Sequence, residues 1–481
     1  MVWVLELFRS LTPKGFPAIY GTVVASEPVE LAEREEILSR LKEALKTGNL
    51  RAAKELASLV RPPEVLEIWE DLSAEERFIL LEVLPPQEAT EVLSNLELED
   101  QVELLRTIPP LRAAELLARL APDDLADLAG AMQDDDPELA ELLFKRLPLE
   151  VQDQLARLTE YQEDEAGGLM TPDFVALRAE MSVDQVLRFL RRAGPDAETV
   201  YYLYVVDSQQ KLLGVLSLRD LIVAPLSTRV QEIMKPDAVY VRTDTDQEEV
   251  AHLMRDYDLS VLPVVDESDR LVGIVTIDDV LDVIEEEVTE DIYRLGAVEA
   301  PDLVYSRSSV TELWLARVRW LIVLVVAGMF TSSILAGFES VLGAVTALSF
   351  YIPVLLGTGG NTGNQSATLI IRALATRDLE PDDWFKVLRK EVAVGLLLGA
   401  VLAALIAVKV IYDGYAELTL VVALALLSLV LVANLVGALL PLILRRLGVD
   451  PALISNPLVA TASDLSGLLI YLAIARYLLD I

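Results

Sequence analysis

The sequence contains no cysteine and a single histidine, His252, among its 481 residues. The absence of cysteine excludes disulfides and thiolate metal sites. Any metal ion must therefore be bound by oxygen atoms, which favours hard cations such as Mg²⁺, Ca²⁺ or Mn²⁺ over Zn²⁺ or Cu²⁺. The chain also has no cysteine–histidine pair for nucleophilic catalysis and no phosphate-binding lysine loop, so an enzyme is the least favoured class of protein.

Basic residues are scarce: 40 lysines and arginines stand against 76 aspartates and glutamates, a net charge of −36. The part from Trp314 onward contains 11 basic and 11 acidic residues, so the whole net charge belongs to the part before it. Such acidity disfavours nucleic acids and anionic membrane surfaces as partners, and it favours cations.

Five segments of the C-terminal part carry few or no charges, and each is long enough to cross a lipid bilayer as a helix of ~20 residues. They are residues 320–338, 340–371, 392–408, 418–444 and 451–475. Basic residues cluster before the first segment, between the second and third, and between the fourth and fifth. Because basic loops stay on the cytoplasmic side, this pattern predicts cytoplasmic N-terminal domains and a C-terminus outside the inner membrane.

The second segment contains an unusual polar stretch, Pro353–Thr368, with four glycines, two asparagines, a glutamine and several hydroxyls. Irregular backbone and amide groups are tolerated at membrane depth only against protein or a water-filled path, and the alternative is close helix packing through small residues. Asp464 is the single charge between Pro451 and Ala475. Since an ionisable residue inside a span indicates a functional site, the two stretches together predict a cation path.

Residues 31–158 show apolar residues at helical spacing, and two phrases beginning Pro85-Pro86 and Pro109-Pro110 recur with a period of 24. Short helices that start at prolines and repeat at fixed intervals predict an all-α superhelix of stacked units. On the residues alone, the acidic side chains of this region are solvated faces and helix caps.

A second repeat opens at Met170-Thr-Pro and again at Met234-Lys-Pro, and each copy reads helix, strand, turn, strand, helix. The closing motifs, Gly214…Ser217…Asp220 and Gly273…Thr276…Asp279, resemble the nucleotide-contacting signature of a tandem CBS module. That resemblance implies that the hydroxyl reaches a phosphate and the aspartate a ribose. The candidate nucleotide residues are Tyr202, Gly214, Ser217, Arg219 and Asp220, and the nucleotide would be ATP or another adenine nucleotide.

The stretch Asp278–Asp291 contains eight acids in fourteen residues, and no base occurs before Arg294. Its apolar residues fall at helical spacing, and its like charges at i,i+4 destabilise the helix. Dense carboxylates without compensating lysines are groups that a divalent cation would neutralise, so this segment is predicted to be a cation-responsive linker to the membrane part.

The order of these parts resembles the MgtE family of magnesium channels and transporters. The resemblance runs from about Leu31 to the C-terminus and rests on three strings, which begin at Glu163, Gly357 and Asn456. It implies a homodimer in a lipid bilayer whose pore is lined mainly by the second and fifth spans. Asp464 would attract Mg²⁺ in that pore, with Asn364, Asn456 and the carbonyl of Ala460 nearby.

The resemblance also implies sites that sense Mg²⁺ outside the pore. The matching positions are Glu91, Asp123, Asp127, the backbone of Gly168, Asp246, Glu248, Asp258, Asp279, Asp282, Glu287, Glu290, Asp291 and Asp450.

The predicted organisation is a multidomain membrane protein. It comprises an unassigned extension (1–30), an acidic all-α superhelical N domain (31–160), an α/β tandem CBS pair (161–277), an acidic connecting, or plug, helix (278–313) and a five-helix transmembrane pore domain (314–481). The predicted function is Mg²⁺ uptake through a selective channel that cytoplasmic Mg²⁺ closes. The alternative is a secondary-active divalent cation transporter or exchanger with the same sensor, which inverted repeats would indicate; the five spans show none.

Overall fold

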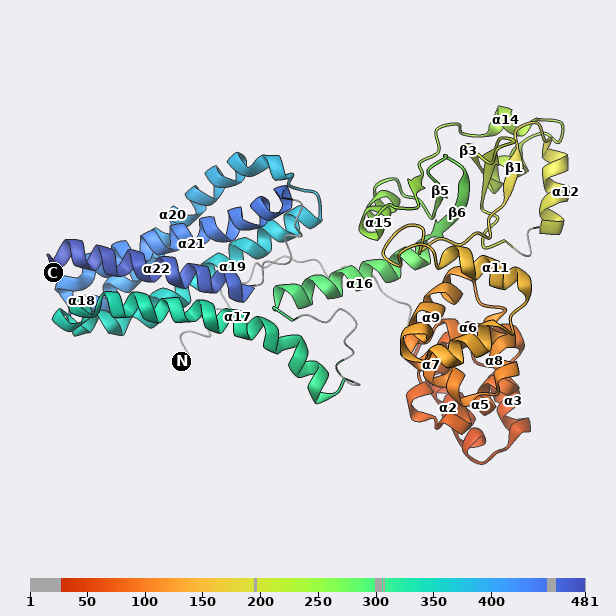
Figure 1. Ribbon diagram of the computed structural model, residues 1–481, viewed down its shortest axis with the longest axis horizontal. Helices are drawn as coiled ribbons and strands as arrows, with labels where there is room; N and C mark the ends of the chain where they lie inside the picture. The colour runs from red at the N-terminus through yellow and green to blue at the C-terminus, as the bar shows by residue number, and fades with distance from the viewer. Residues whose placement is uncertain (1–26, 194–196, 299–304, 306–307, 448–455, 481) are drawn as a thin grey trace. The chain divides into compact units, whose positions relative to one another are not determined.

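The computed structural model describes residues 27–193, 197–298, 305, 308–447 and 456–480. These described residues form two compact units, which divide between Leu281 and Asp282 (Figure 1). Most of the predicted N-terminal extension and the candidate Mg²⁺ ligand Asp450 lie outside the described residues.

The first half of the N-terminal unit is a stack of short helices, as the repeating proline phrases predict. The elements are α2 (Glu27–Lys46), α3 (Leu50–Ala57), α4 (Pro62–Leu66), η1 (Trp69–Asp71), α5 (Ala74–Val83), α6 (Pro86–Ser94), α7 (Leu98–Thr107), α8 (Pro110–Leu117), α9 (Pro122–Asp135), α10 (Pro137–Phe144) and α11 (Leu149–Leu158). Helices α6, α8 and α9 begin at proline, where the missing N–H has no helical partner to lose. Their apolar sides share one continuous core around the buried Trp69, Leu93 and Leu117.

The second half of the N-terminal unit contains two copies of one α/β motif. The first copy comprises β1 (Ala176–Arg178), α12 (Val183–Ala193), β2 (Tyr202–Val206), β3 (Leu212–Ser217) and α13 (Leu218–Val223); the second comprises α14 (Val230–Ile233), β4 (Val241–Arg242), α15 (Gln247–Asp256), β5 (Val261–Val265), β6 (Leu271–Thr276) and the start of α16 (Ile277–Leu295). In each sheet the first strand is parallel to the second and the third is antiparallel to it. Tyr204 and Val206 of one sheet pack with Val261 and Ile274 of the other, so the repeats form a pair.

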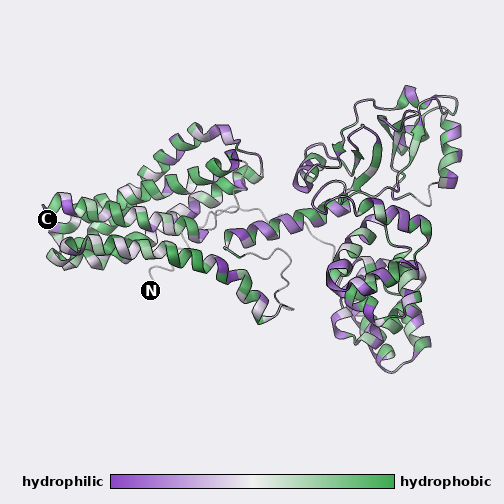
Figure 2. Ribbon diagram, viewed as in Figure 1, coloured by the Kyte–Doolittle hydropathy of each residue, from purple (hydrophilic) through white to green (hydrophobic). Residues whose placement is uncertain are grey.

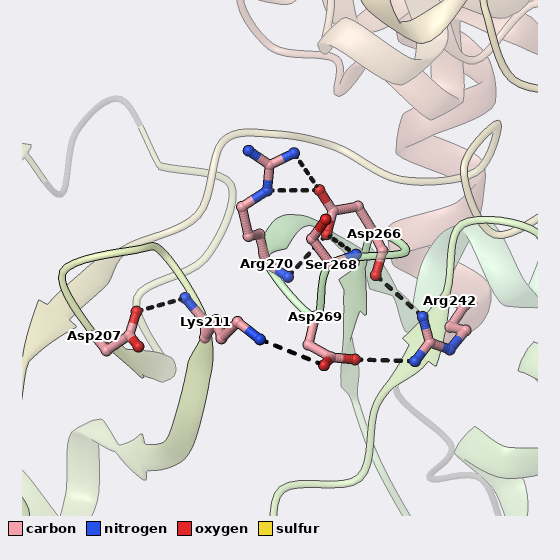
Figure 3. A network of polar contacts seen from close by, with 7 residues as sticks. All are labelled: Asp207, Lys211, Arg242, Asp266, Ser268, Asp269 and Arg270. Atoms are coloured by element: carbon pink, nitrogen blue, oxygen red, sulfur yellow. Dashed lines mark hydrogen bonds and ion pairs between the residues drawn. The ribbon is translucent and has the colours of Figure 1, made fainter.

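A polar network joins the hairpin turns of the two copies (Figure 3). Asp269 accepts a hydrogen bond from Arg242 at 2.9 Å and lies 3.7 Å from the ammonium of Lys211 in the other hairpin. Arg270 pairs with Asp266, whose backbone carbonyl accepts a hydrogen bond from Arg242. These contacts hold together the ends of the two sheets, on one side of the pair.

The C-terminal unit is almost entirely helical. After α16 its elements are α17 (Val310–Gly337), α18 (Glu339–Ala344), η3 (Thr346–Tyr351), α19 (Ile352–Ala375), η4 (Pro381–Asp383), α20 (Trp384–Tyr412), η5 (Ala416–Leu418), α21 (Thr419–Arg446) and α22 (Asn456–Leu479). Leu355, Leu429 and Leu468 meet in its core. The Tyr471 hydroxyl donates a hydrogen bond to the carbonyl of Leu348 at 2.9 Å and so ties α22 to η3.

Helices α17, α20, α21 and α22 overlap the first, third, fourth and fifth predicted spans, whereas the second, 340–371, divides into α18, η3 and most of α19. Within the described residues, four segments are long and apolar enough to cross a membrane by length and composition: Val310–Gly337, Pro381–Tyr412, Ala416–Arg446 and Asn456–Leu479. Their green colour in Figure 2 contrasts with the mixed colours of the N-terminal unit. Helix α19 has 24 residues, which is enough to span a bilayer, but its polar stretch lowers its hydropathy.

Two features that the sequence left open are decided by the structure. The polar stretch Pro353–Thr368 is regular α-helix throughout rather than irregular backbone, because side chains small enough for close helix contacts leave the backbone hydrogen bonds of α19 intact. The apolar residues of α16 do not form one buried stripe: Val280 and Val283 are buried, whereas Leu281, Ile284 and Val288 are exposed.

Candidate ion path and regulatory sites

Helices α19 and α22 pack closely at the polar stretch. A Cβ placed on Gly360 would lie 3.4 Å from the Cβ of Ala460 and 4.0 Å from Oδ1 of Asp464. One turn further along α19, a Cβ on Gly363 would lie 2.8 Å from the Ser463 hydroxyl, so only glycine fits there without displacement. Elsewhere along the pair, Leu355 of α19 lies in one core cluster with Leu468 of α22, whereas Ala367 and Ile371 of α19 lie in a cluster with Val459. Later residues of α19 thus meet earlier residues of α22, so the helices are antiparallel, as a second and a fifth span must be.

The predicted pore residues lie on this pair of helices. Asp464 is half-buried on α22 beside Gly360. Asn364 is one turn beyond Gly360, toward the end of the pair at which α22 begins with Asn456. The Oδ1 atoms of both asparagines are buried and have no hydrogen-bond partner among the described residues. Buried amide oxygens without partners are unfavourable unless something binds them, so these two atoms fit a path for hydrated cations.

The opposite side of α19 contacts α20 and α21. A Cβ on Gly359 would collide with Leu429, and a Cβ on Gly437 would lie 2.1 Å from the carbonyl oxygen of Gly363. Ile370 packs with Val387 and other side chains of α20 and α21. The glycines of the polar stretch thus allow close packing on both sides of α19, while Asn364 lies on the side that faces α22.

An acidic cluster lies where α9 meets the start of α16 in the N-terminal unit. Asp123 is only 8% exposed, and its Oδ1 has no hydrogen-bond partner among the described residues. Burial raises the pKa of Asp123 to about 8, with further contributions from the negative charges of Asp279, Asp124 and Glu198. Burial also raises the pKa of Asp279 to about 6, against the lowering effect of its hydrogen bond from the Thr276 hydroxyl. Carboxylates that repel one another out of water are groups a divalent cation would neutralise.

A second pair of predicted positions lies near the beginning of α15. The loop that contains Gly168 runs beside Asp246, because Ala166 donates to the carbonyl of Thr245 and Gln247 donates to the carbonyl of Asp164. Asp246 caps α15 by accepting from the N–H of Glu248 at 2.9 Å. A Cβ on Gly168 would lie 2.4 Å from the Gln162 carbonyl, so this turn requires glycine.

The other predicted sensor residues are not gathered at one point. Glu91 and Asp258 are exposed. Asp127 is partly buried on α9, one turn from Asp123. Asp282, Glu287, Glu290 and Asp291 belong to the C-terminal unit, where Glu290 pairs with Arg294. Within the described ranges, no three histidine, aspartate or glutamate side chains converge closely enough to hold a metal ion. These residues therefore stay predictions.

The two CBS motifs form sites of opposite character. The first motif borders an open groove of about 770 Å³, and its lining residues are Tyr201, Tyr202, Ser217, Leu218, Arg219, Ile222, Val223, Lys235, Ser260 and Val261. Asp220 accepts a hydrogen bond from Ser217 at the edge of the groove. Gly214 does not line it; the absence of a side chain there lets β3 approach the Lys235 carbonyl. The second motif lies in the acidic cluster, where the Thr276 hydroxyl contacts the carboxylates of Asp278 and Asp279 through hydrogen bonds.

Several residues of these sites were not predicted from the sequence. Lys235 lines the groove but comes from the second repeat. The signal that could have found it is its place in the repeated Met-x-Pro opening, together with the need for a glycine at position 214. A contact between Ser366, Glu391 and Asn434 ties three membrane helices together. Two of these residues are polar positions within apolar spans, which is the available signal for them.

Family models match most of the chain. A model described as the MgtE intracellular N domain matches residues 60–164, the CBS domain model matches residues 166–227 and 230–286, and a model described as a divalent cation transporter, MgtE, matches residues 352–474. The matches follow the same order as the helical stack, the paired α/β motif and the long helices.

Individual proteins extend this similarity. The chain is 60% identical to the magnesium transporter MgtE of Thermus thermophilus over 446 residues, which cover 93% of this chain and 99% of the relative. It is 37% identical to the magnesium transporter MgtE of Enterococcus faecalis over 323 residues, 67% of this chain and 71% of that one. A crystal structure of the cytosolic domain of the Mg²⁺ channel MgtE in complex with ATP has 56% sequence identity and a TM-score of 0.50, and covers 51% of this chain and 99% of that chain. The chain thus belongs to the MgtE family of divalent cation transporters.

Proposed function

We propose that the chain transports Mg²⁺ into the cell, as a channel in the inner membrane that cytosolic Mg²⁺ closes. Its full-length relatives are named magnesium transporters, which supports transport rather than catalysis as its activity. Asp464 carries the proposal: it is a carboxylate within a membrane helix, beside a glycine of the polar stretch. The same helix pair contains two amide oxygens that have no hydrogen-bond partner in the part of the chain that the structure describes.

The chemistry of this lining suits Mg²⁺. The ion gives up its hydration water reluctantly, so a path for it needs few direct carboxylates and several oxygen atoms that accept hydrogen bonds from bound water. Asp464 would supply the charge, while Asn364, Asn456 and the carbonyl of Ala460 would contact the hydration shell. In a homodimer, which the family resemblance implies, a second Asp464 would face the first across the axis.

Closure would use the acidic cluster of the N-terminal unit. Without Mg²⁺, burial and the negative charge of Asp279 disfavour ionisation of Asp123 at the contact between the helical stack and the CBS pair. Mg²⁺ at this contact would stabilise the compact form of the unit, because it binds that form better than one in which the acids are apart. The acids of α16, including Glu287, Glu290 and Asp291, would transmit this state to the pore helices.

Flux measurements test the proposal directly. Purified protein in liposomes should pass Mg²⁺ without any imposed counter-ion gradient, and the flux should stop as Mg²⁺ on the cytosolic face rises from zero to ~10 mM, a range above the affinity of weak carboxylate sites. Flux that requires a second ion gradient would instead identify the alternative, a coupled transporter with the same sensor. The absence of Mg²⁺ flux under both conditions would refute both.

The first CBS groove is proposed to bind an adenine nucleotide such as ATP. Arg219 and Lys235 place two cations on its lining, Ser217 offers a hydroxyl, and Tyr202 offers an aromatic face for a base. The second motif is surrounded by carboxylates that would repel phosphate. This asymmetry supports one nucleotide per chain, and a nucleotide bound close to the sensor contact would tune its affinity for Mg²⁺.

Removing either cation of the groove should weaken nucleotide binding. For Arg219→Ala and Lys235→Ala we expect the ATP dissociation constant to rise about tenfold each, because each loses a charge-assisted contact to phosphate. Titration calorimetry on the full-length protein measures this change. Lys211→Ala is the matched control, since Lys211 is also a partly exposed lysine of the CBS pair but does not line the groove. An equal loss of affinity in the control would argue against binding in this groove.

A further inference from the structure

A polar contact between three membrane helices lies directly behind the candidate ion path. The Ser366 hydroxyl on α19 donates to Oε2 of Glu391 on α20 at 3.2 Å. The Asn434 amide on α21 donates to the same Oε2 at 2.6 Å and to the backbone carbonyl of Glu391 at 2.9 Å. Ser366 and Asn434 are each 3% exposed. We call these three residues the Glu391 clamp.

The clamp lies at the level of Asn364 but on the other side of α19. At 3.6 residues per turn, two residues separate their side chains by about 200° around the helix axis. The side of α19 that contains Gly360 and Asn364 faces α22, whereas Ser366 faces α20 and α21. A rotation of α19 that moved Asn364 away from α22 would therefore break the hydrogen bond to Glu391.

The other contacts behind α19 resist such a rotation weakly. Gly359 packs against Leu429, and Ile370 packs against apolar side chains; these van der Waals contacts have little directional preference. The hydroxyls of Thr358 and Thr362 do not oppose the rotation either, because both donate hydrogen bonds to carbonyls of their own helix. A hydrogen bond to a carboxylate has a preferred direction and is strong in a medium of low dielectric constant.

We propose that Glu391 is a positioning residue for Mg²⁺ recognition, holding α19 in the rotation that presents Asn364 to the ion path. The inference rests on the proposed function, because it assigns Asn364 to the recognition of Mg²⁺. Glu391 itself does not contact the ion; it acts through Ser366. Asn434, with two hydrogen bonds to Glu391, fixes the carboxylate in place and links the clamp to α21.

The absence of native cysteine allows the rotation of α19 to be measured without any transport assay. A Cβ on Gly360 would lie 3.4 Å from the Cβ of Ala460, close to the separation found in disulfides. The pair Gly360→Cys and Ala460→Cys should therefore cross-link α19 to α22 on mild oxidation of the full-length protein. A second pair, Gly399→Cys and Leu427→Cys, reports on the contact between α20 and α21, since a Cβ on Gly399 would lie 3.2 Å from the Leu427 Cα.

We expect Glu391→Leu to slow the α19–α22 cross-link at least about fivefold, the scale of one lost hydrogen bond to a charged group. The α20–α21 cross-link should slow much less, because Asn434 keeps its hydrogen bond to the backbone carbonyl of residue 391. Ser366→Ala should act in the same direction, whereas Glu391→Gln should retain most of the rate because its amide oxygen still accepts a hydrogen bond. Thr362→Val is the matched control: it removes a buried hydroxyl from α19 that bonds only within the helix.

The same variants, without the added cysteines, are then compared in Mg²⁺ flux. Glu391→Leu should raise the half-saturating Mg²⁺ concentration about fivefold and reduce the maximal flux less, as expected for lost recognition. An unchanged α19–α22 cross-link, or an equal slowing of both cross-links, would overturn the positioning role. If the wild-type protein carries no Mg²⁺ but the cross-links respond as expected, the proposed function fails while the clamp is retained as a structural contact.

Discussion

Replacing Asp464 by alanine is expected to reduce Mg²⁺ flux at least about 100-fold, to the background of protein-free liposomes. At an effective dielectric constant of about 20, the attraction between a carboxylate and a cation about 4 Å away is about 4 kcal/mol per unit of cation charge. This energy exceeds the roughly 3 kcal/mol that corresponds to a 100-fold change. Asp464 is the single charged residue of α22 before Arg476, so no neighbouring carboxylate on that helix can replace it. Flux of Mg²⁺ into liposomes measures the loss.

The matched control is Asp480→Ala, which removes a carboxylate from the exposed end following the same helix and should leave flux within about twofold of wild type. Mg²⁺-dependent protection of the N-terminal unit against protease should persist in Asp464→Ala, because that unit does not contain Asp464. Loss of both flux and protection would show that Asp464 is needed for folding, and normal flux would remove it from the ion path.

Much of this site could be predicted because its chemistry is unusual for its position in the chain. Amides, glycines and one carboxylate within otherwise apolar spans are costly in lipid, so their presence alone indicates a polar path. The sequence could not predict that the polar stretch is a regular helix, since four glycines are equally compatible with broken backbone. The structure shows the reason for the glycines: Gly359, Gly360 and Gly363 each lie close to a different side chain of a neighbouring helix.

The parts that were missed depend on contacts between distant segments. Lys235 reaches the first CBS groove from the second repeat. Glu391 is preceded by Arg389 and Lys390 and resembles an ordinary interfacial charge in the sequence; its hydrogen bonds to Ser366 and Asn434 join residues separated by 25 and 43 positions. Periodicity reports which side of a helix is polar, but it does not report which other helix that side meets.

The two CBS motifs show the same limit in another way. From the sequence, Ser217 with Asp220 and Thr276 with Asp279 are equivalent, and either pair could contact a nucleotide. The difference arises from their neighbours: basic side chains border the first motif, whereas Asp123 of the helical stack places a further buried carboxyl group beside the second. The function of each motif is therefore decided by tertiary contacts that a repeat alignment does not contain.

The acidic contact makes a strong prediction for Asp123→Asn in buffer without Mg²⁺. The pKa of Asp123 is about 8 in the folded protein and 3.8 in a solvated reference, so the folded state binds a proton more tightly than the unfolded state. Proton binding to an aspartate with a raised pKa therefore stabilises the folded state. This stabilisation is largest below about pH 4 and is lost as the pH rises toward about 8. Asparagine does not titrate, so the variant should exceed wild type in stability at neutral pH by a few kcal/mol, and this excess should shrink toward pH 5.

Protease resistance of the N-terminal unit in full-length protein, measured against urea at several pH values, tests this prediction. Added Mg²⁺ should stabilise wild type and have a weaker effect on Asp123→Asn, because the variant has lost the charge that the ion would neutralise. Asp134→Asn is the matched control, since Asp134 lies on the same helix α9 but is exposed. A variant that is less stable than wild type at neutral pH, or that keeps the full response to Mg²⁺, would show that Asp123 is not part of the sensor.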